Sequence, residues 1–496
     1  MSCTSACLLR APAHLSHDFD KLTNQVTRDS VTRDTGSAPG AREPIVEVGA
    51  SMIEQLMRIT QRCLDPATLT VFTFLLMTAG TAQTATTTES RPAAPPQICA
   101  GNVCSPVAKK PTPSATGSGV KWHPGHYGLS LSKSTPKGVS QVHADWAAML
   151  SSDSHFVGVY GFYDWYHLEP TAQGAYDFSS IDNDIAWLNA NFPGKKLAIE
   201  VWTRNFCAGT TALPAVPQDT NAVCTKVPDY IITGAFTGSG GSPGATWNKN
   251  GALAAFWSNA VLARLQALDA ALAARYDNNP TVEAIRYDEY SPPQPLPGAP
   301  TLGFSQGAEV TAWNALHAKM AADWVHTNKA DHANFPANAS GSVDNRLFAY
   351  LQSIKVGVGG PDILPPVSQG GCCGGESWGA QLLRGAGVVN GSDFGTTDYR
   401  GTIPIIYEAE NPAWPMDAAE LENYAYSTLQ ATHVAWLYNP RNVGTGNWAL
   451  GAGSTPWTTA SPNANGNPGI LDTLRAHGFR IHGSCPTVYN GNCNTN

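Results

Sequence analysis

Strand-like and helix-like segments alternate from residue 120 to about residue 440, and this alternation restricts the fold more than any other feature. Short apolar runs of strand length recur there, separated by segments with helical spacing. We expect strands at 126–132, 156–166, 195–204, 282–289, 333–340, 354–362, 402–410 and 432–440. Strands that alternate with helices predict a parallel sheet. Eight such units predict an α/β fold, the closed (β/α)8 TIM barrel with extended loops.

Two of the intervening segments carry the clearest helical patterns. In 252–276, one stripe at helical spacing is made of Leu253, Phe256, Trp257, Val261, Leu265 and Leu268. The segment 417–431 opens with an aspartate that suits an N-cap and has acids in its first turn. An open dinucleotide-binding sheet is the doubly wound alternative. It needs a glycine-rich turn, and "VGVGGPD" (356–362) lacks the third glycine and the following helix.

The N-terminal part of the chain differs from the rest. Residues 1–51 are polar and patternless, and we expect them to be a non-structural extension, with translation starting at Met52 or Met57. Residues 52–82 combine two arginines, an apolar run and small residues, which is the pattern of a secretory signal peptide. The apolar run is too short to span a bilayer comfortably, so we expect no stable membrane insertion after signal removal.

Residues 83–119 are rich in Thr, Pro, Ser and Ala and indicate a linker, which leaves 120–496 as the expected barrel domain. Of the 11 cysteines, eight lie beyond residue 82, and an even number suits an oxidising compartment. The expected pairs are Cys99–Cys104, Cys207–Cys224, Cys485–Cys493 and the adjacent Cys372–Cys373. A metal site is the competing interpretation, but no Cys-x-x-Cys pair or His cluster at ligand spacing favours it.

The charge balance narrows the possible partners. The formal net charge is −8 and no basic run occurs, whereas phosphate binding needs clustered Lys and Arg, so we expect no nucleic-acid partner. Only 14% of the residues are charged, and Gly, Pro and aromatic residues are abundant. Together with the signal segment, this composition favours a secreted or periplasmic protein.

Carboxylates and aromatic residues collect where the predicted strands end. The fourth strand ends at Asp288 and Glu289, and the seventh ends at Glu408 and Glu410. Other strand ends carry Asp164, Trp165, Trp202, Arg204, Asn338 and Trp436. In a TIM barrel the C-terminal ends of the strands form the active site. Paired carboxyl groups hydrolyse glycosidic bonds, and flat aromatic rings stack on sugars, so we expect an oligo- or polysaccharide substrate and no cofactor.

The stretch "YDWYHLEPTAQGAYDFSSID" (163–182) resembles the segment after the second strand in the large clan of retaining glycoside hydrolases with a (β/α)8 barrel, which includes cellulases, mannanases and β-galactosidases. The matching residues are Trp165, Glu169, Pro170, Gly174, Tyr176, Asp177, Phe178 and Asp182. The resemblance implies a secreted O-glycoside hydrolase with Glu289 as acid/base. It also implies that Glu408 or Glu410 is the nucleophile and that Trp436 is a sugar platform. We prefer Glu408, which lies nearer the apolar run.

The sequence departs from this clan at two places. Asp288 stands where the clan usually has an Asn that binds the sugar 2-hydroxyl, and the end of the sixth strand offers no tyrosine to touch the nucleophile. A non-catalytic carbohydrate-binding barrel therefore remains the alternative. The sugar, the linkage and exo or endo action depend on the loops and are not predicted.

Overall fold

The computed structural model describes residues 99–100, 103–104, 119–130, 139–204, 227–234, 244–248, 251–290, 301–361, 363, 365, 376–409, 418–438, 457–458 and 468–495. The chain forms two units, residues 1–109 and 110–496. In the first unit, strands β1 (Cys99–Ala100) and β2 (Val103–Cys104) pair antiparallel. All other described elements belong to the second unit.

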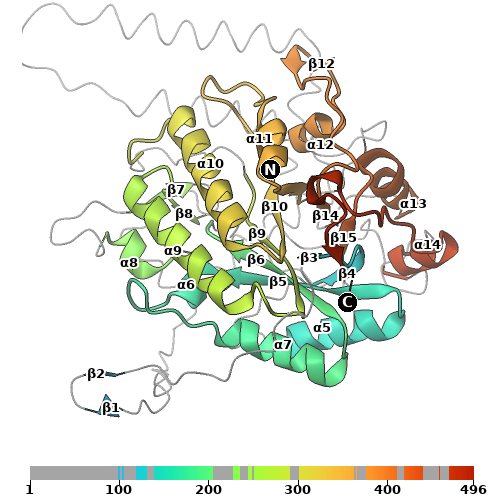
Figure 1. Ribbon diagram of the computed structural model, residues 1–496, viewed down its shortest axis with the longest axis horizontal. Coiled ribbons are helices and arrows are strands. Elements are labelled where there is room, and N and C mark those ends of the chain that lie inside the picture. Colours follow the sequence, from blue (N-terminus) through green and yellow to red (C-terminus); the bar gives the residue numbers. More distant parts are fainter. Residues whose placement is uncertain are drawn as a thin grey trace, which may run out of the picture. The chain divides into compact units, whose positions relative to one another are not determined.

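Eight parallel strands of the second unit close into a barrel, which confirms the predicted (β/α)8 fold (Figure 1). In order around the barrel they are β4 (Gly125–Leu129), β5 (Phe156–Asp164), β6 (Lys196–Trp202), β9 (Val282–Tyr287), β10 (Asn328–His332), β11 (Gly357–Gly360), β14 (Ile405–Ala409) and β15 (His433–Leu437). All but the fifth overlap the ranges expected from the sequence. Strands that follow one another along the chain are neighbours in the barrel, and the pair β15–β4 closes it.

Helices cover the outside of the barrel, and α9 and α10 lie side by side (Figure 1). The helices are α5 (Val139–Ser152), α6 (Trp165–Leu168), α7 (Ser179–Asn191), α8 (Asp229–Ile232), α9 (Asn259–Tyr276), α10 (Gln306–Asp323), α11 (Leu347–Ser353), α12 (Trp378–Leu383), α13 (Ala418–Asn423) with the π-helical turn η2 (Tyr424–Leu429), α14 (Ile470–Ala476) and the 3-10 turn η4 (Thr487–Tyr489). The helix predicted from residue 252 begins later, because strand β8 (Gly251–Ala254) pairs with β7 (Ala245–Asn248) instead. A further hairpin joins β12 (Val388–Val389) and β13 (Ser392–Asp393).

The fifth strand was predicted at 333–340 and lies at 328–332, so that prediction was wrong. The strand reads "NKADH" and carries almost no apolar side chain, although all of its residues are buried. Several of its polar side chains have partners instead. The Asn328 amide donates to Glu283 at 2.8 Å, and Asp331 lies 3.0 Å from the His317 ring. Hydropathy alone gives no signal for such a strand.

The strand pleat divides the core into two layers. Successive side chains point alternately into the barrel and toward the helices. The inner layer consists of Tyr127, Leu129, Tyr160, Phe162, Ala198, Trp202, Ala284, Ala330, Ile406, Ala435 and Leu437. The larger outer layer packs the other faces of the strands against the helices. This alternation decides which strand-end residues can reach the site.

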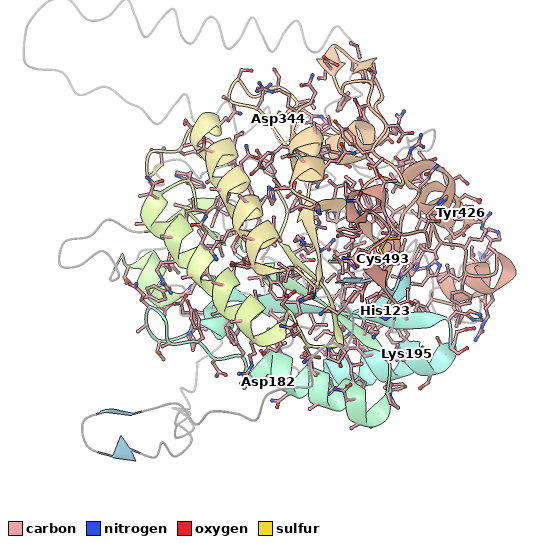
Figure 2. All side chains as sticks on the ribbon, in the orientation of Figure 1. His123, Asp182, Lys195, Asp344, Tyr426 and Cys493 are labelled. Atoms are coloured by element: carbon pink, nitrogen blue, oxygen red, sulfur yellow. A yellow bond between two sulfur atoms is a disulfide. The ribbon has the colours of Figure 1, made fainter. Side chains whose placement is uncertain are left out.

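The C-terminal segment returns to the start of the domain. Strand β16 (Cys493–Asn494) pairs with β3 (Val120–Lys121), with Cys493, labelled in Figure 2, opposite Val120. The predicted disulfide Cys485–Cys493 is confirmed. The residues of the other expected pairs, Cys207–Cys224 and Cys372–Cys373, lie outside the described residues, and the side chains of Cys99 and Cys104 are not described either.

The residues that carry the clan resemblance form a clamp between the barrel and its helices. The buried Glu169 carboxylate accepts a hydrogen bond from Trp165 Nε1 at 2.8 Å and one from the Gly174 backbone at 2.5 Å. It also forms an ion pair with Arg264 of α9, whose guanidinium reaches the Tyr176 hydroxyl at 3.2 Å. The motif therefore fixes the loop after β5.

We predict that Glu169→Ala lowers the free energy of unfolding by about 3–5 kcal/mol, because it leaves a buried guanidinium and an indole N–H without their acceptor. Glu420→Ala on α13 is the control and is expected to change it by less than about 0.5 kcal/mol. Chemical denaturation followed by tryptophan fluorescence measures both. Equal stability of the two variants would contradict the clamp.

Candidate active site

The interior of the barrel holds an arginine between two glutamates. Strand register places Glu200 of β6 opposite Arg286 of β9, and Arg286 Nε donates to Glu200 Oε2 at 2.6 Å. Arg286 Nη2 lies 2.5 Å from the same oxygen and also forms an ion pair with Glu408 of β14. All three side chains are buried. Branched apolar residues usually fill a TIM barrel, so this charged triad is the candidate site in the barrel interior.

The triad is surrounded by aromatic rings. Trp202 Nε1 donates to Glu200 Oε1 at 2.7 Å, and its indole packs on Phe162 with ring centroids 4.8 Å apart. The Arg286 guanidinium lies 5.1 Å from the centre of the Tyr160 ring. Burial alone acts to raise the pKa of Glu200, but Arg286 and His332 outweigh it and hold that pKa below its usual value. These neighbours therefore favour the ionised form of Glu200 inside the barrel.

His332, at the end of β10, interacts electrostatically with both Glu200 and Glu289. Its Nδ1 lies 3.5 Å from Glu200 Oε1. Burial and the nearby Arg286 lower the pKa of His332, which favours the neutral ring. Glu200 and Glu289 act in the opposite direction on the same histidine.

Glu289 follows β9 and is held toward the chain that follows β10. The Tyr290 N–H donates to the His332 carbonyl at 2.8 Å, which aligns the two segments. Asn334 Nδ2 donates to Glu289 Oε1 at 2.5 Å, and the Glu289 side chain remains half-buried. Glu289 thus lies at the C-terminal end of the fourth strand, as predicted.

Asp288, which directly follows β9, makes internal contacts. Its buried carboxylate accepts hydrogen bonds from the Thr203 hydroxyl at 2.8 Å, the Thr203 N–H at 3.1 Å and the Arg204 N–H at 2.8 Å. These donors engage both oxygens, so Asp288 ties the end of β9 to the end of β6, and its contact with substrate stays a prediction. Burial raises the pKa of Asp288 from its usual 3.8 to about 6.

Three other candidates, Trp165, Trp436 and Asn338, use their polar groups in internal contacts. Trp165 is buried in the outer core and donates to Glu169. Trp436 alternates with the inward-facing Ala435 and Leu437, so it faces the helices, where its Nε1 lies 2.8 Å from His126 Nδ1. The Asn338 side chain closes a turn, because its Oδ1 accepts from the Ser340 N–H at 2.9 Å and its Nδ2 donates to the Val343 carbonyl.

Other candidates keep positions compatible with a site at this end of the barrel. Trp202 faces inward and is 7% exposed at the end of β6. Arg204 follows on the same strand face, and Asp164 ends β5 beside His167 at 3.4 Å. Their contact with substrate stays a prediction. Glu410 lies outside the described residues.

An exposed aromatic pair lies beside Glu289 and is absent from the predicted site. Phe335 is 39% exposed, and its ring centroid lies 6.1 Å from that of the half-buried Trp378. The Gly379 N–H donates to the Asn334 carbonyl at 3.2 Å, which holds the pair next to the residue that binds Glu289. Phe335 and Asn334 lay inside the predicted fifth strand, whereas the structure places them just after strand β10. No sequence pattern indicates that Glu200, Arg286 and His332 lie close together.

Within the described residues, no group of three or more His, Cys, Asp or Glu side chains is placed to hold a metal ion. In the same part of the chain, no helix is both long and apolar enough to cross a membrane.

The fold and the strand-end carboxylates define a (β/α)8-barrel protein with an acidic centre. No family model and no curated protein matches the chain. Among solved structures, the chain is similar to the catalytic domain of β-amylase from Paenibacillus polymyxa, with 11% identity, 74% of this chain and 100% of that chain covered, and a TM-score of 0.44.

Two further structures are similar to the same degree. One is a GH5_18 protein from Bifidobacterium longum, with 11% identity, 73% and 81% coverage and a TM-score of 0.43. The other is endo-glycoceramidase II from Rhodococcus, with 15% identity, 72% and 80% coverage and a TM-score of 0.38. These values are low, so the fold assignment rests on the closed barrel itself.

We predict that the free energy of unfolding of the wild type rises relative to that of Asp288→Asn as the pH falls from about 6 to about 4. The pKa of the folded state is raised, so the native protein binds this proton more tightly than the unfolded chain, and its stability falls as the pH rises through that window. The difference between the variants should change by up to about 3 kcal/mol. Denaturation at several pH values measures it, and a flat difference would contradict the raised pKa.

Proposed function

We propose that the protein is a glycoside hydrolase that cleaves O-glycosidic bonds in an oligo- or polysaccharide with retention of configuration. The observation that carries this proposal is the pair of glutamates at the ends of the fourth and seventh strands of a closed barrel. Glu289 follows β9 and Glu408 lies in β14. The clan that residues 163–182 resemble uses these two strand ends for its acid/base and its nucleophile.

The mechanism follows from the chemistry of the two carboxyl groups. An oxygen of Glu408 attacks the anomeric carbon, while Glu289 gives its proton to the departing glycosidic oxygen. A water molecule then loses a proton to Glu289 and displaces Glu408 from the sugar. Asn334 donates to one oxygen of Glu289, which orients the other oxygen for proton transfer. Arg286 places a positive charge beside the attacking carboxylate.

A non-catalytic carbohydrate-binding barrel is the second candidate. The complete burial of Glu408 and its ion pair with Arg286 favour it, because a locked carboxylate cannot attack a sugar. In a third arrangement Glu410 is the nucleophile and Glu408 only supports it. These candidates differ in turnover and in which variant abolishes it.

We also propose that the protein works outside the cytoplasm. The signal-like segment 52–82 supports this, as does the disulfide Cys485–Cys493. Disulfides persist mainly in oxidising compartments.

We expect Glu289→Gln and Glu408→Gln each to lower kcat by at least about 100-fold on the cognate sugar, since each removes a group that acts in the transition state. A panel of aryl glycosides and soluble polysaccharides identifies that sugar. Glu420→Gln is the matched control and should retain full activity. A wild-type protein that binds sugar without hydrolysis supports the binding barrel, and loss of activity in Glu410→Gln alone transfers the nucleophile to Glu410.

Azide tests the assignment of the acid/base and the retaining course together. In Glu289→Ala, azide needs no general base and should accelerate turnover of an aryl glycoside with formation of a glycosyl azide of retained configuration. Proton NMR of the first product reports the configuration. An inverted product would exclude the covalent intermediate.

Phe335 is expected to stack on a sugar unit of an extended substrate. We predict that Phe335→Ala raises KM for a polysaccharide roughly tenfold and leaves KM for an aryl monosaccharide unchanged. Val388→Ala removes another exposed apolar side chain, which is 73% exposed on the β12–β13 hairpin, and serves as control. Equal KM values for Phe335→Ala and the control would exclude Phe335 from the binding surface.

A further inference from the structure

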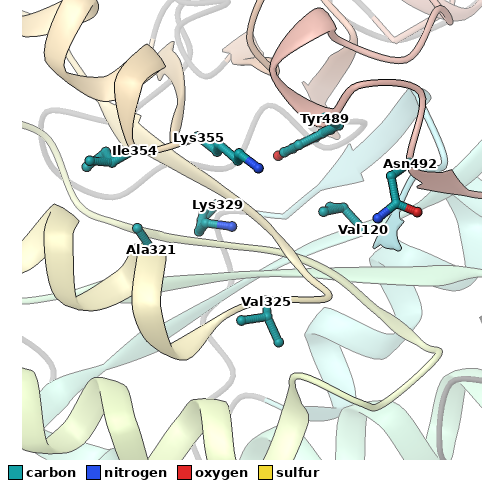
Figure 3. A pocket seen from close by; sticks show the side chains of 8 residues that line it. All are labelled: Val120, Ala321, Val325, Lys329, Ile354, Lys355, Tyr489 and Asn492. Atoms are coloured by element: carbon teal, nitrogen blue, oxygen red, sulfur yellow. The ribbon is translucent and has the colours of Figure 1, made fainter. Parts of the chain in front are cut away.

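A cavity of about 290 Å³ lies at the N-terminal ends of β10 and β11. It is lined by Val120, Ala321, Val325, Lys329, Ile354, Lys355, Tyr489 and Asn492 (Figure 3). The lining comes from the end of α10, from the turn before β11 and from the β3–β16 pair. The carboxylates proposed for hydrolysis follow or end strands at the opposite end of the barrel, so the cavity is a separate site.

Two lysines provide its charge. Lys329 is the second residue of β10 and is only 4% exposed, and its ammonium donates to the Trp324 carbonyl at 2.8 Å. Lys355 adopts a left-handed backbone conformation with φ of 59° in the turn before β11. Figure 3 shows the amino ends of both side chains directed into the same space, toward Tyr489.

The position of Lys329 is electrostatically unfavourable without a partner in the cavity. Burial lowers the pKa of Lys329 to about 8, Asp277 acts to raise it, and the positive charge of Lys355 acts to lower it further. Within the described part of the chain, neither lysine forms an ion pair with a carboxylate. An ammonium has three donors, and the Trp324 carbonyl takes one of them.

We propose that this cavity binds a small anion with a phosphate or carboxylate head group. Lys329 and Lys355 would hold the head group, since lysine is a common point-charge ligand for phosphate. The Asn492 side chain can add a neutral donor, and Val120, Val325 and Ile354 offer apolar contact to a short organic body. The volume lies at the lower end for ligand sites, which excludes a polysaccharide chain.

The competing explanation is structural. Trp324 is the C-cap of α10, and a lysine near a helix C-terminus stabilises the carbonyls there. Lys329 alone fits this role, but Lys355 has no part in capping α10. The two explanations therefore separate on Lys355, which is exposed and lies in a turn.

Titration of the full-length protein with inorganic phosphate and with acetate, against chloride at equal ionic strength, tests the proposal. We expect phosphate, acetate or both to raise Tm with increasing concentration in the wild type. Lys355→Met should raise the dissociation constant for the anion, measured by calorimetry, at least about tenfold. Lys329→Met should do the same where it folds. Lys319→Met is the control, because Lys319 pairs with Asp323 on α10 and should leave binding unchanged.

Two outcomes would overturn the proposal. One is a Tm response to both anions no larger than that to chloride, and the other is an equal dissociation constant in the wild type and Lys355→Met. Loss of stability in Lys329→Met alone, without anion binding, would leave the capping role. Glu408→Gln is expected to bind the anion normally, so failure of the hydrolase proposal and failure of this one are distinguishable.

Discussion

The ion pairs of Arg286 with Glu200 and Glu408 constrain the register of the barrel strands. Three charged side chains in a barrel interior lose their hydration, and only mutual contact offsets that loss. The strands must therefore keep a register that brings β6, β9 and β14 to the same depth. Trp202 and His332 add contacts to Glu200, and the Tyr160 ring packs near the guanidinium. The half-buried Glu289 follows the strand that carries Arg286.

Around this centre, buried polar clamps determine where the loops leave the barrel. Asp288 holds the Thr203 and Arg204 backbone, so the fourth and third strands end together. Glu169 holds the loop after the second strand against α9. Both acids lie in motifs that suggest chemistry, yet their contacts are internal. These internal contacts alone explain why both acids stand where they do.

The sequence predicts the barrel well because seven strands have apolar faces that pack against helices. It fails at β10, where burial is achieved with hydrogen bonds rather than apolar area. The positions of Glu289 and Glu408 follow from strand order alone. Trp436 lies outside the site for a different reason, since one step along a strand moves a side chain to the other face. Trp165 begins α6 instead of ending a strand. No spacing in one strand reveals Arg286, whose partners come from two other strands.

Strand β10 has polar contacts at both of its ends, and these contacts account for its unusual composition. Its last residue, His332, contacts Glu200 inside the barrel, and Asn334 just beyond it binds Glu289. Its second residue, Lys329, points outward to the cavity below α10. An apolar strand would pack equally well but would serve neither end. Each buried polar side chain needs a partner that an apolar residue would not need, so the sequence "NKADH" adds little stability. The contacts that Lys329 and His332 make at the two ends of the strand explain this sequence better.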